Sequence, residues 1–320
     1  MLDTGVKKGG AARPRPTSRL SVIASGLVDD RGISALMLAP AVLVLLAINV
    51  YPILYTMYLS LFQYDASIPN AVPVFAGFEN YRKLLSDANF LSSARITLTF
   101  VTAAVSIELT VGILIGLMIS GRHPLIRAAR VALLLPFIMA PVAAGVLWRT
   151  LFNVSWGPLD WLIRHLGLPP QQFLASPSQA LMAVTMVEIW QQLPPVAFVV
   201  AAGYSSLPRD VYLAAAVDGA SIWQTFWRIT LPLLRPVIFV ILLLRTMDAF
   251  KVYDIIAMLT QGGPASQTKL VSYLIWESGV RFLDMGRASA MSCIFLIAVF
   301  LISLLFIRAL AWARVQTGAT

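Results

Sequence analysis

LPRDVYLAAAVDGASIWQTFWRITLPLLRP, residues Leu207–Pro236, is an amphipathic stretch set between two very apolar segments of the chain. Pro208 suits the first turn of a helix, where its missing N–H costs nothing, and Asp210 complements the positive end of the helix dipole. We therefore predict a helix over about Arg209–Val217. Gly219 supplies the permissive backbone that ends this helix.

A second short helix is predicted after a sharp turn at Asp218–Ala220. Ser221 and Gln224 match the S-x-x-Q capping box, in which each side chain accepts a hydrogen bond from the other residue's backbone N–H. We expect this helix to stop near Pro232. Such a pair either lies among lipid headgroups as an interfacial amphipathic element or is presented to a soluble partner.

The composition identifies a membrane protein. Hydrophobic residues make up 58% of the 320 residues, charged residues only 12%, and the mean hydropathy is +0.79. These values are too apolar for a soluble domain of this size. Apolar runs long enough to cross about 30 Å of hydrocarbon predict the membrane spans. There are six: Ser34–Phe62, Ala94–Ser120, Ala128–Phe152, Ala180–Tyr204, Pro236–Leu259 and Ala288–Ala311.

The expected fold class is therefore all-α, a multi-pass protein of the inner (plasma) membrane with the helix pair between its fourth and fifth spans. Residues 1–33 form a tail, and residues 34–315 form the membrane domain with its loop at residues 207–235. Lysine and arginine gather on the tail and in the loops after the second and fourth spans, which predicts that both termini and the helix pair are cytoplasmic. The net charge of +9 fits an anionic lipid surface and requires no nucleic acid.

Several chemistries are excluded because their residues are absent from the sequence. A single cysteine, Cys293, and two histidines, His123 and His165, on opposite sides of the membrane leave no disulfide framework and no His-rich metal site. The sequence contains no G-x-x-x-x-G-K-[ST] phosphate loop and no catalytic motif that we recognise. We therefore expect no cofactor in this chain. If the protein uses ATP, another chain must bind it.

Ionisable residues inside the predicted spans are candidates for a functional site. A row of alternating charges occupies the fifth span: Arg245, Asp248, Lys251 and Asp254. Neighbours three residues apart can pair along one helix, but the whole row turns about half way round it. Charges in hydrocarbon cost at least about 2.5 kcal/mol each, so some of them must face water or charges on other helices.

Polar residues in the fourth span are the natural companions of this row. Glu188, Gln191 and Gln192 lie beside Trp190 and the helix-distorting pair Pro194–Pro195. A broken helix with polar and aromatic side chains suits a sugar, whose hydroxyl groups need donors and acceptors. We predict a substrate path that includes Glu188, Gln191, Gln192, Asp248 and Lys251.

The alternative is that these charges only hold helices together, because buried ion pairs often serve packing or specificity. In the second span, Glu108 is expected to be such a structural partner. Gly112 and Gly116 in the same span form a G-x-x-x-G pattern, which indicates close packing against another helix.

The helix pair resembles a known element, the EAA loop of binding-protein-dependent ABC importer permeases. The resemblance rests on Ala214–Ser221, followed by Phe226, Ile229, Pro232 and Pro236. In that family the loop docks into a groove on the cytoplasmic ATPase. The resemblance implies docking residues Leu213, Ala214, Ala215, Asp218, Gly219, Ala220, Ser221 and Phe226. Leu213 stands where the family usually has a glutamate, which suggests an asymmetric complex with a second, more regular permease.

Other segments resemble the carbohydrate branch of the family, the maltose-type permeases. They are Gly77–Tyr81 in the first outer loop and Tyr253–Ile256 with Leu259–Pro264 at the exit of the fifth span. The resemblance adds Tyr253 to the substrate path. It implies a permease subunit without covalent chemistry of its own that moves a sugar, such as the disaccharide trehalose.

The same resemblance implies the partners. They are a second homologous permease that completes a heterodimer, two ATP-binding cassette subunits that carry ATP and Mg, an extracytoplasmic sugar-binding lipoprotein, and membrane lipid. Two alternatives stay open: a permease for a non-sugar solute, and a stand-alone secondary transporter. The second alternative would have no use for a docking loop.

Overall fold

The computed structural model describes residues 30–121 and 123–316, and the predicted tail lies outside the described residues as far as residue 29. The chain divides into two units, Met1–Tyr55 and Thr56–Thr320. From Asp30 the first unit is helical. It contains most of α2 (Asp30–Leu59), whose segment Leu36–Leu59 has a mean hydropathy of 2.2 and is long enough to span a membrane.

The membrane-spanning helices agree with a polytopic protein. Besides α2, four further helices of the described chain are long and apolar enough to span: α4 (Ala88–Met118), α8 (Ala180–Ser205), the continuous helix Ile222–Phe250, and Met285–Arg308 of α14 (Met285–Gln316). A bent pair, α5 (Pro124–Ile138) with α6 (Pro141–Leu151), makes the number of spans up to six.

The bent pair corrects the prediction of one continuous third span over Ala128–Phe152. The axes of α5 and α6 differ by 97°. Met139 and Ala140 between them are extended, with ψ of 134° and 136°. Ala140 precedes Pro141, and a residue before proline is disfavoured in the helical region. The apolar run continues through this region of the sequence, but the helix is interrupted between Ile138 and Pro141.

The fifth span also differs from its predicted bounds. It starts earlier, because α10 (Ile222–Thr225) continues through a π-helical turn, η1 (Phe226–Thr230), into α11 (Leu231–Phe250). The predicted stop near Pro232 is therefore wrong. The π turn shifts the hydrogen-bond register, and the N–H of Leu231 bonds to the carbonyl of Phe226. Pro232, which has no N–H and would clash with a carbonyl in a regular helix, is accommodated directly after this shift.

The fifth span ends sooner than predicted. Instead of reaching Leu259, α11 ends at Phe250, and a separate helix, α12 (Asp254–Leu259), begins after a break. The N–H groups of Lys251 and Val252 bond to the carbonyls of Asp248 and Ala249, three residues back, so the last turn is tightened. The hydroxyl of Ser272 donates to the carbonyl of Val252 at 2.5 Å.

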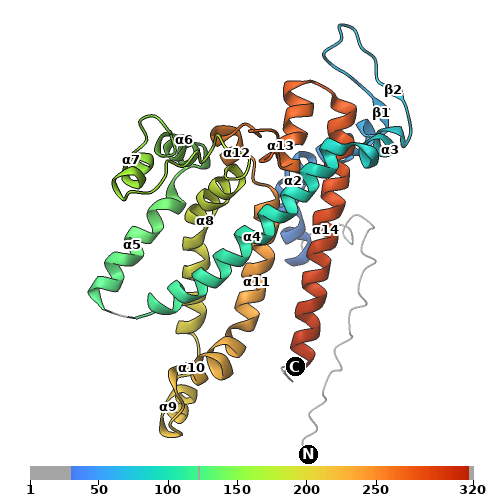
Figure 1. Cartoon of the computed structure of the whole chain (residues 1–320). Helices are drawn as coiled ribbons and strands as arrows, with labels where there is room; N and C mark the ends of the chain where they lie inside the picture. Colours follow the sequence, from blue (N-terminus) through green and yellow to red (C-terminus); the bar gives the residue numbers. More distant parts are fainter. Residues whose placement is uncertain (1–29, 122, 317–320) are drawn as a thin grey trace, which may run out of the picture. The chain divides into compact units, whose positions relative to one another are not determined.

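Shorter elements connect the spans. In the second unit they are a two-stranded hairpin, β1 (Phe62–Gln63) with β2 (Val74–Phe75), and the helices α3 (Glu79–Ser86), α7 (Pro158–His165), α9 (Arg209–Val217), α13 (Val271–Trp276) and the π turn η2 (Glu277–Arg281). Within this unit, α9 and α10 lie at one end of the long helices and α6, α7 and α12 at the other (Figure 1).

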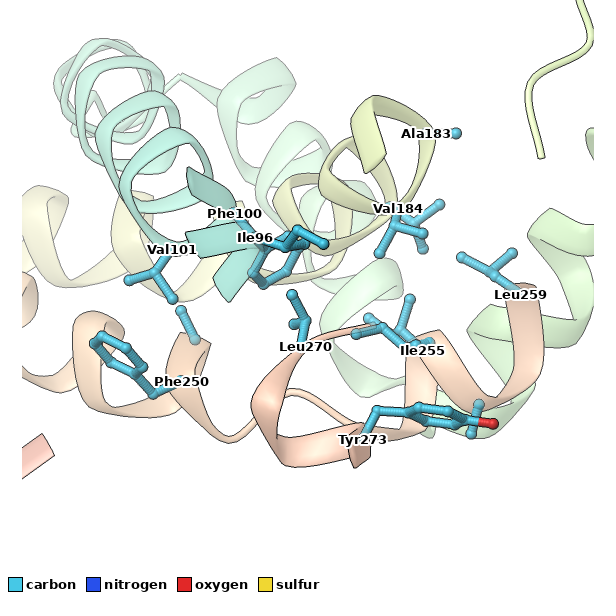
Figure 2. Close-up of a cluster of buried hydrophobic side chains, with 14 of the residues drawn as sticks. Ile96, Phe100, Val101, Ala183, Val184, Phe250, Ile255, Leu259, Leu270 and Tyr273 are labelled. Atoms are coloured by element: carbon cyan, nitrogen blue, oxygen red, sulfur yellow. The ribbon is translucent and has the colours of Figure 1, made fainter. Parts of the chain in front are cut away.

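The core of the second unit forms where α4, α8, α11 and α12 meet. Phe100, Val184 and Leu270 are fully buried in it, and Figure 2 shows the cluster around them. The predicted close packing of α4 is present. A Cβ atom on Gly112 would lie 2.5 Å from Cγ1 of Val196 in α8, so only glycine allows this approach.

Candidate functional site

Arg245 of α11 joins three helices. Its Nε donates to Glu108 Oε2 of α4 at 2.9 Å, and its Nη2 donates to Glu188 Oε1 of α8 at 3.0 Å. Its Nη1 donates to Gln192 Oε1 at 3.3 Å. The side chains of Arg245, Glu108 and Glu188 are 6%, 0% and 2% exposed. Buried charges of this kind need good geometry and satisfied hydrogen bonds, and the guanidinium fork supplies both.

The predicted row of ion pairs along one helix is only partly correct. Asp248 pairs with Lys251 at 2.9 Å and lies 3.8 Å from Arg245. Asp254 belongs to α12, because α11 has already ended, and its carboxylate forms no ion pair with any residue that the structure describes. The strongest partners of Arg245 lie on other helices. Glu108 is buried and pairs with Arg245, which agrees with its predicted role as a structural partner.

A recess of about 270 Å³ opens beside this cluster. All six residues predicted for the substrate path line it: Glu188, Gln191, Gln192, Asp248, Lys251 and Tyr253. Pro141, Arg245, Val252, Asp254 and Ile255 complete the lining. Pro141 is not among the residues predicted for the site from the sequence. The signal that could have identified it is that a proline disfavours a continuous helix through the third span. The structure thus gathers residues from α6, α8, α11 and α12 around one polar space.

Gln191 is a notable member of this lining. It is 1% exposed, and its Nε2 donates to the carbonyl of Met139, at the α5–α6 break, at 2.8 Å. Its Oε1 has no hydrogen-bond partner among the described residues. A buried acceptor without a partner is costly, so this oxygen is suited to a ligand donor.

Two features expected near Gln191 differ from the prediction. The helix α8 runs without interruption over Pro194 and Pro195, so the broken helix of this region is the α5–α6 pair instead. Trp190 packs edge-on against Trp148, with ring centroids 5.3 Å apart, and does not line the recess. The aromatic ring of the recess belongs to Tyr253.

Tyr253 is held by a small aromatic group. Its ring stacks on Tyr273 at 6.0 Å between centroids and contacts Trp276 at 5.2 Å. Burial raises the pKa of Tyr253 and also that of Tyr273 above the usual phenol value, which already leaves the hydroxyl protonated at neutral pH. Tyr253 therefore offers the recess a neutral hydroxyl and a fixed ring face.

A larger recess, of about 790 Å³, lies elsewhere in the second unit. Residues of the β1–β2 hairpin and α3 line it together with Asp284 and Arg287 near the start of α14. None of the residues predicted for the substrate path or for docking lines it. We favour the smaller recess as the candidate site, because it combines buried charges, an acceptor without a partner and an aromatic ring.

The helix pair α9–α10 has the local geometry that the sequence predicts. The predicted helix Arg209–Val217 is present, Gly219 has φ of +72°, and the Ser221–Gln224 capping box is formed in both directions. Tyr212 Oη donates to Thr230 Oγ1 at 3.1 Å and so ties α9 to η1. Burial raises the pKa of Tyr212, which keeps this donor protonated.

The predicted docking residues differ in exposure. Ala215 is buried, Ala220 and Phe226 are half-buried, and Leu213, Ala214, Asp218, Gly219 and Ser221 are exposed. Apolar side chains dominate the exposed face: Leu213 is 65% exposed, Val217 89% and Ile222 91%. An exposed apolar patch of this kind is typical of a surface that meets a partner.

Comparison with known proteins identifies the class. The family described as "Binding-protein-dependent transport system inner membrane component" matches residues 33–316. The chain belongs to this family, and it is a multi-pass, non-catalytic transmembrane component of an ABC transporter.

Permease proteins of several named transport systems are similar to this chain. The trehalose/maltose transport system permease protein MalF of Thermococcus litoralis is 33% identical over 85% of this chain and 92% of its own. The trehalose permease SugA of Mycobacterium tuberculosis is 31% identical over 87% and 89%. The sn-glycerol-3-phosphate permease UgpA of Agrobacterium fabrum is 30% identical over 82% and 89%.

Solved structures support the fold. A chain of a bacterial ABC transporter involved in the import of the acidic polysaccharide alginate has a TM-score of 0.78, with 23% identity over 91% of this chain and 98% of that one. A second structure, of a bacterial alginate ABC transporter in complex with an alginate pentasaccharide-bound periplasmic protein, has a TM-score of 0.77. At this identity the likeness concerns the fold alone.

Proposed function

We propose that the chain is one permease subunit of an ATP-driven sugar importer and that its recess forms part of the sugar path. One observation carries this proposal: the five residues selected for their chemistry, and Tyr253 selected by resemblance, lie together around one recess. Hydroxyl groups of a sugar would find the Gln191 acceptor, the exposed carboxylate of Asp248 and the ring of Tyr253 there. Trehalose, the solute named for two of the similar permeases, is the substrate that we would test first.

The partners follow from the family. The subunit pairs with a homologous permease and with two ATP-binding cassette subunits, which bind ATP and Mg, and receives sugar from an extracytoplasmic binding protein. Both termini and the α9–α10 pair face the cytoplasm in this proposal. The exposed face of α9–α10 would dock into the ATPase, and its apolar character matches the replacement of the family's usual acid by Leu213.

A continuous helix supports coupling between the two regions. Ile222–Phe250 is 29 residues long and therefore spans about 43 Å. It begins beside the docking turn and ends at the recess, where it carries Arg245 and Asp248. Movement of the ATPase against α10 would thus reach the recess through one continuous helix.

The docking turn provides a direct experiment. Gly219 has φ of +72° with nothing within 4 Å of a built Cβ atom, and Gly167, in a connection between other helices, has the same φ of +72° and the same open surroundings. Valine strains the backbone equally at the two sites. We expect Gly219→Val to abolish ATP-driven uptake and sugar-stimulated ATPase activity in the assembled transporter. Gly167→Val should retain both. Uptake that survives Gly219→Val would exclude the turn as the docking element.

One alternative has a specific observation in its favour. The UgpA proteins, which are named for sn-glycerol-3-phosphate, are about as similar to this chain as the trehalose permeases are. An anionic solute is therefore the second candidate. Uptake assays with radiolabelled trehalose and sn-glycerol 3-phosphate, each with its own binding protein, separate the two.

A further inference from the structure

We infer that the recess selects its solute by charge: it admits neutral or cationic polyhydroxy solutes and disfavours anionic ones. The inference rests on the proposed function only in assigning the recess to the solute path. Its basis is the distribution of charged groups, which the similarity to other permeases does not determine.

Both cationic side chains of the recess are already committed to carboxylates. Each nitrogen of the Arg245 guanidinium donates a hydrogen bond, to Glu108, to Glu188 or to Gln192. The Lys251 ammonium lies 2.9 Å from Asp248. An entering phosphate, sulfonate or carboxylate would compete with the buried carboxylates of Glu108 and Glu188 for Arg245, whose side chain is 6% exposed. At Lys251, which is 66% exposed and has further N–H donors, it would lie beside the carboxylate of Asp248 on the same ammonium.

Acidic groups exceed basic groups at the recess. Four carboxylates lie in or directly behind its lining, Glu108, Glu188, Asp248 and Asp254, against the two cations Arg245 and Lys251. The side chain of Asp248 is 54% exposed, and Asp254 is exposed without an ion-pair partner among the described residues. In a recess partly enclosed by protein, such an excess produces a potential that attracts cations and repels anions.

The remaining polar atoms are mostly acceptors. Gln191 Oε1 is buried without a partner, and the carboxylates of Asp248 and Asp254 offer further lone pairs. A ligand rich in hydroxyl or ammonium donors satisfies these atoms. A phosphate brings only more acceptors at neutral pH.

The sign of this potential can be measured without a sugar. The cysteine variant Val252→Cys places a thiol in the lining of the recess, and the native Cys293 is buried, so wild-type protein gives the background. The assembled transporter in lipid nanodiscs is treated with a cationic and an anionic methanethiosulfonate. The rate at which each reagent modifies the protein thiol is divided by the rate at which the same reagent modifies a small thiol free in solution. Ser178→Cys is the control, because it is exposed and lies in the loop between α7 and α8, where residues 166–180 carry no charged side chain.

We expect the cationic reagent to modify Val252→Cys roughly tenfold faster than the anionic one, and the two reagents to react equally with Ser178→Cys. Adding Asp254→Asn should lower the ratio, and adding Lys251→Gln should raise it. A ratio of one or less, a ratio insensitive to Asp254→Asn, or no modification by either reagent overturns the inference. The measurement uses neither ATP nor sugar, so it can fail while ATP-driven sugar uptake, which tests the proposed function, succeeds.

Discussion

At the scale of single residues, Arg245 is the side chain on which the site depends. The sequence identified it as a charge inside a span and suggested partners at intervals of three. Only Asp248, 3.8 Å away, comes from that local pattern. Its closer partners, Glu108 and Glu188, are 137 and 57 residues away in the chain, so no local spacing could pair them with it. Residue types therefore predicted the members of the recess, and the fold determined how they pair.

Replacing Arg245 should destabilise the protein strongly. Arg245→Ala leaves two buried carboxylates without their cation, and we expect it to lower the free energy of unfolding by about 3–5 kcal/mol. Lys251→Ala is the matched control, because the Lys251–Asp248 pair is more than half exposed and should contribute at most about 1 kcal/mol. Denaturant unfolding of the purified protein checks both values. Equal decreases in the free energy of unfolding for the two variants would show that the buried ion pairs of Arg245 do not stabilise the fold more than the exposed pair does.

At the scale of elements, local signals were sufficient for the helix pair and insufficient for the spans. Proline, glycine and the capping box fix α9 and the start of α10 within a few residues, so the sequence predicted them well. In the third span a single Pro141 outweighs a long apolar run, and in the fifth a tightened turn ends α11 without any proline. Hydropathy reports where a chain is apolar and does not report where its axis bends.

The exposed apolar face that we propose for docking gives a prediction for α9. Leu213→Ala should weaken binding of the ATPase subunits about tenfold, because docking would bury a side chain that is now 65% exposed. Leu166→Ala removes a leucine that is 66% exposed in another connection and should leave binding unchanged. The affinity is measured by passing free ATPase subunits over surface-immobilised permease complex and determining the dissociation constant for each variant. Unchanged affinity for Leu213→Ala would exclude this face from the docking surface.

At the scale of the whole molecule, the two regions that we propose for docking and for the solute path lie apart along the long helices of the second unit. In the second unit, the α9–α10 pair lies at one end of the long helices and α6 and α12 at the other (Figure 1). Residues of α6 and α12 line the recess together with residues of α8 and of α11, which ends the continuous helix Ile222–Phe250. The sequence contains no G-x-x-x-x-G-K-[ST] phosphate loop, in keeping with the proposal that ATP is bound by a partner subunit. The family to which the chain belongs is described as an inner membrane component of binding-protein-dependent transport systems.

Uptake by the reconstituted transporter tests the central claim most directly. Proteoliposomes would contain this chain, its permease partner and the two ATP-binding cassette subunits, with binding protein and radiolabelled trehalose on the outer side and ATP with Mg on the side of α9–α10. We predict accumulation that requires ATP hydrolysis and disappears when the ATP-binding cassette subunits are omitted. Accumulation that persists without those subunits would contradict the assignment of this chain to an ATP-driven importer.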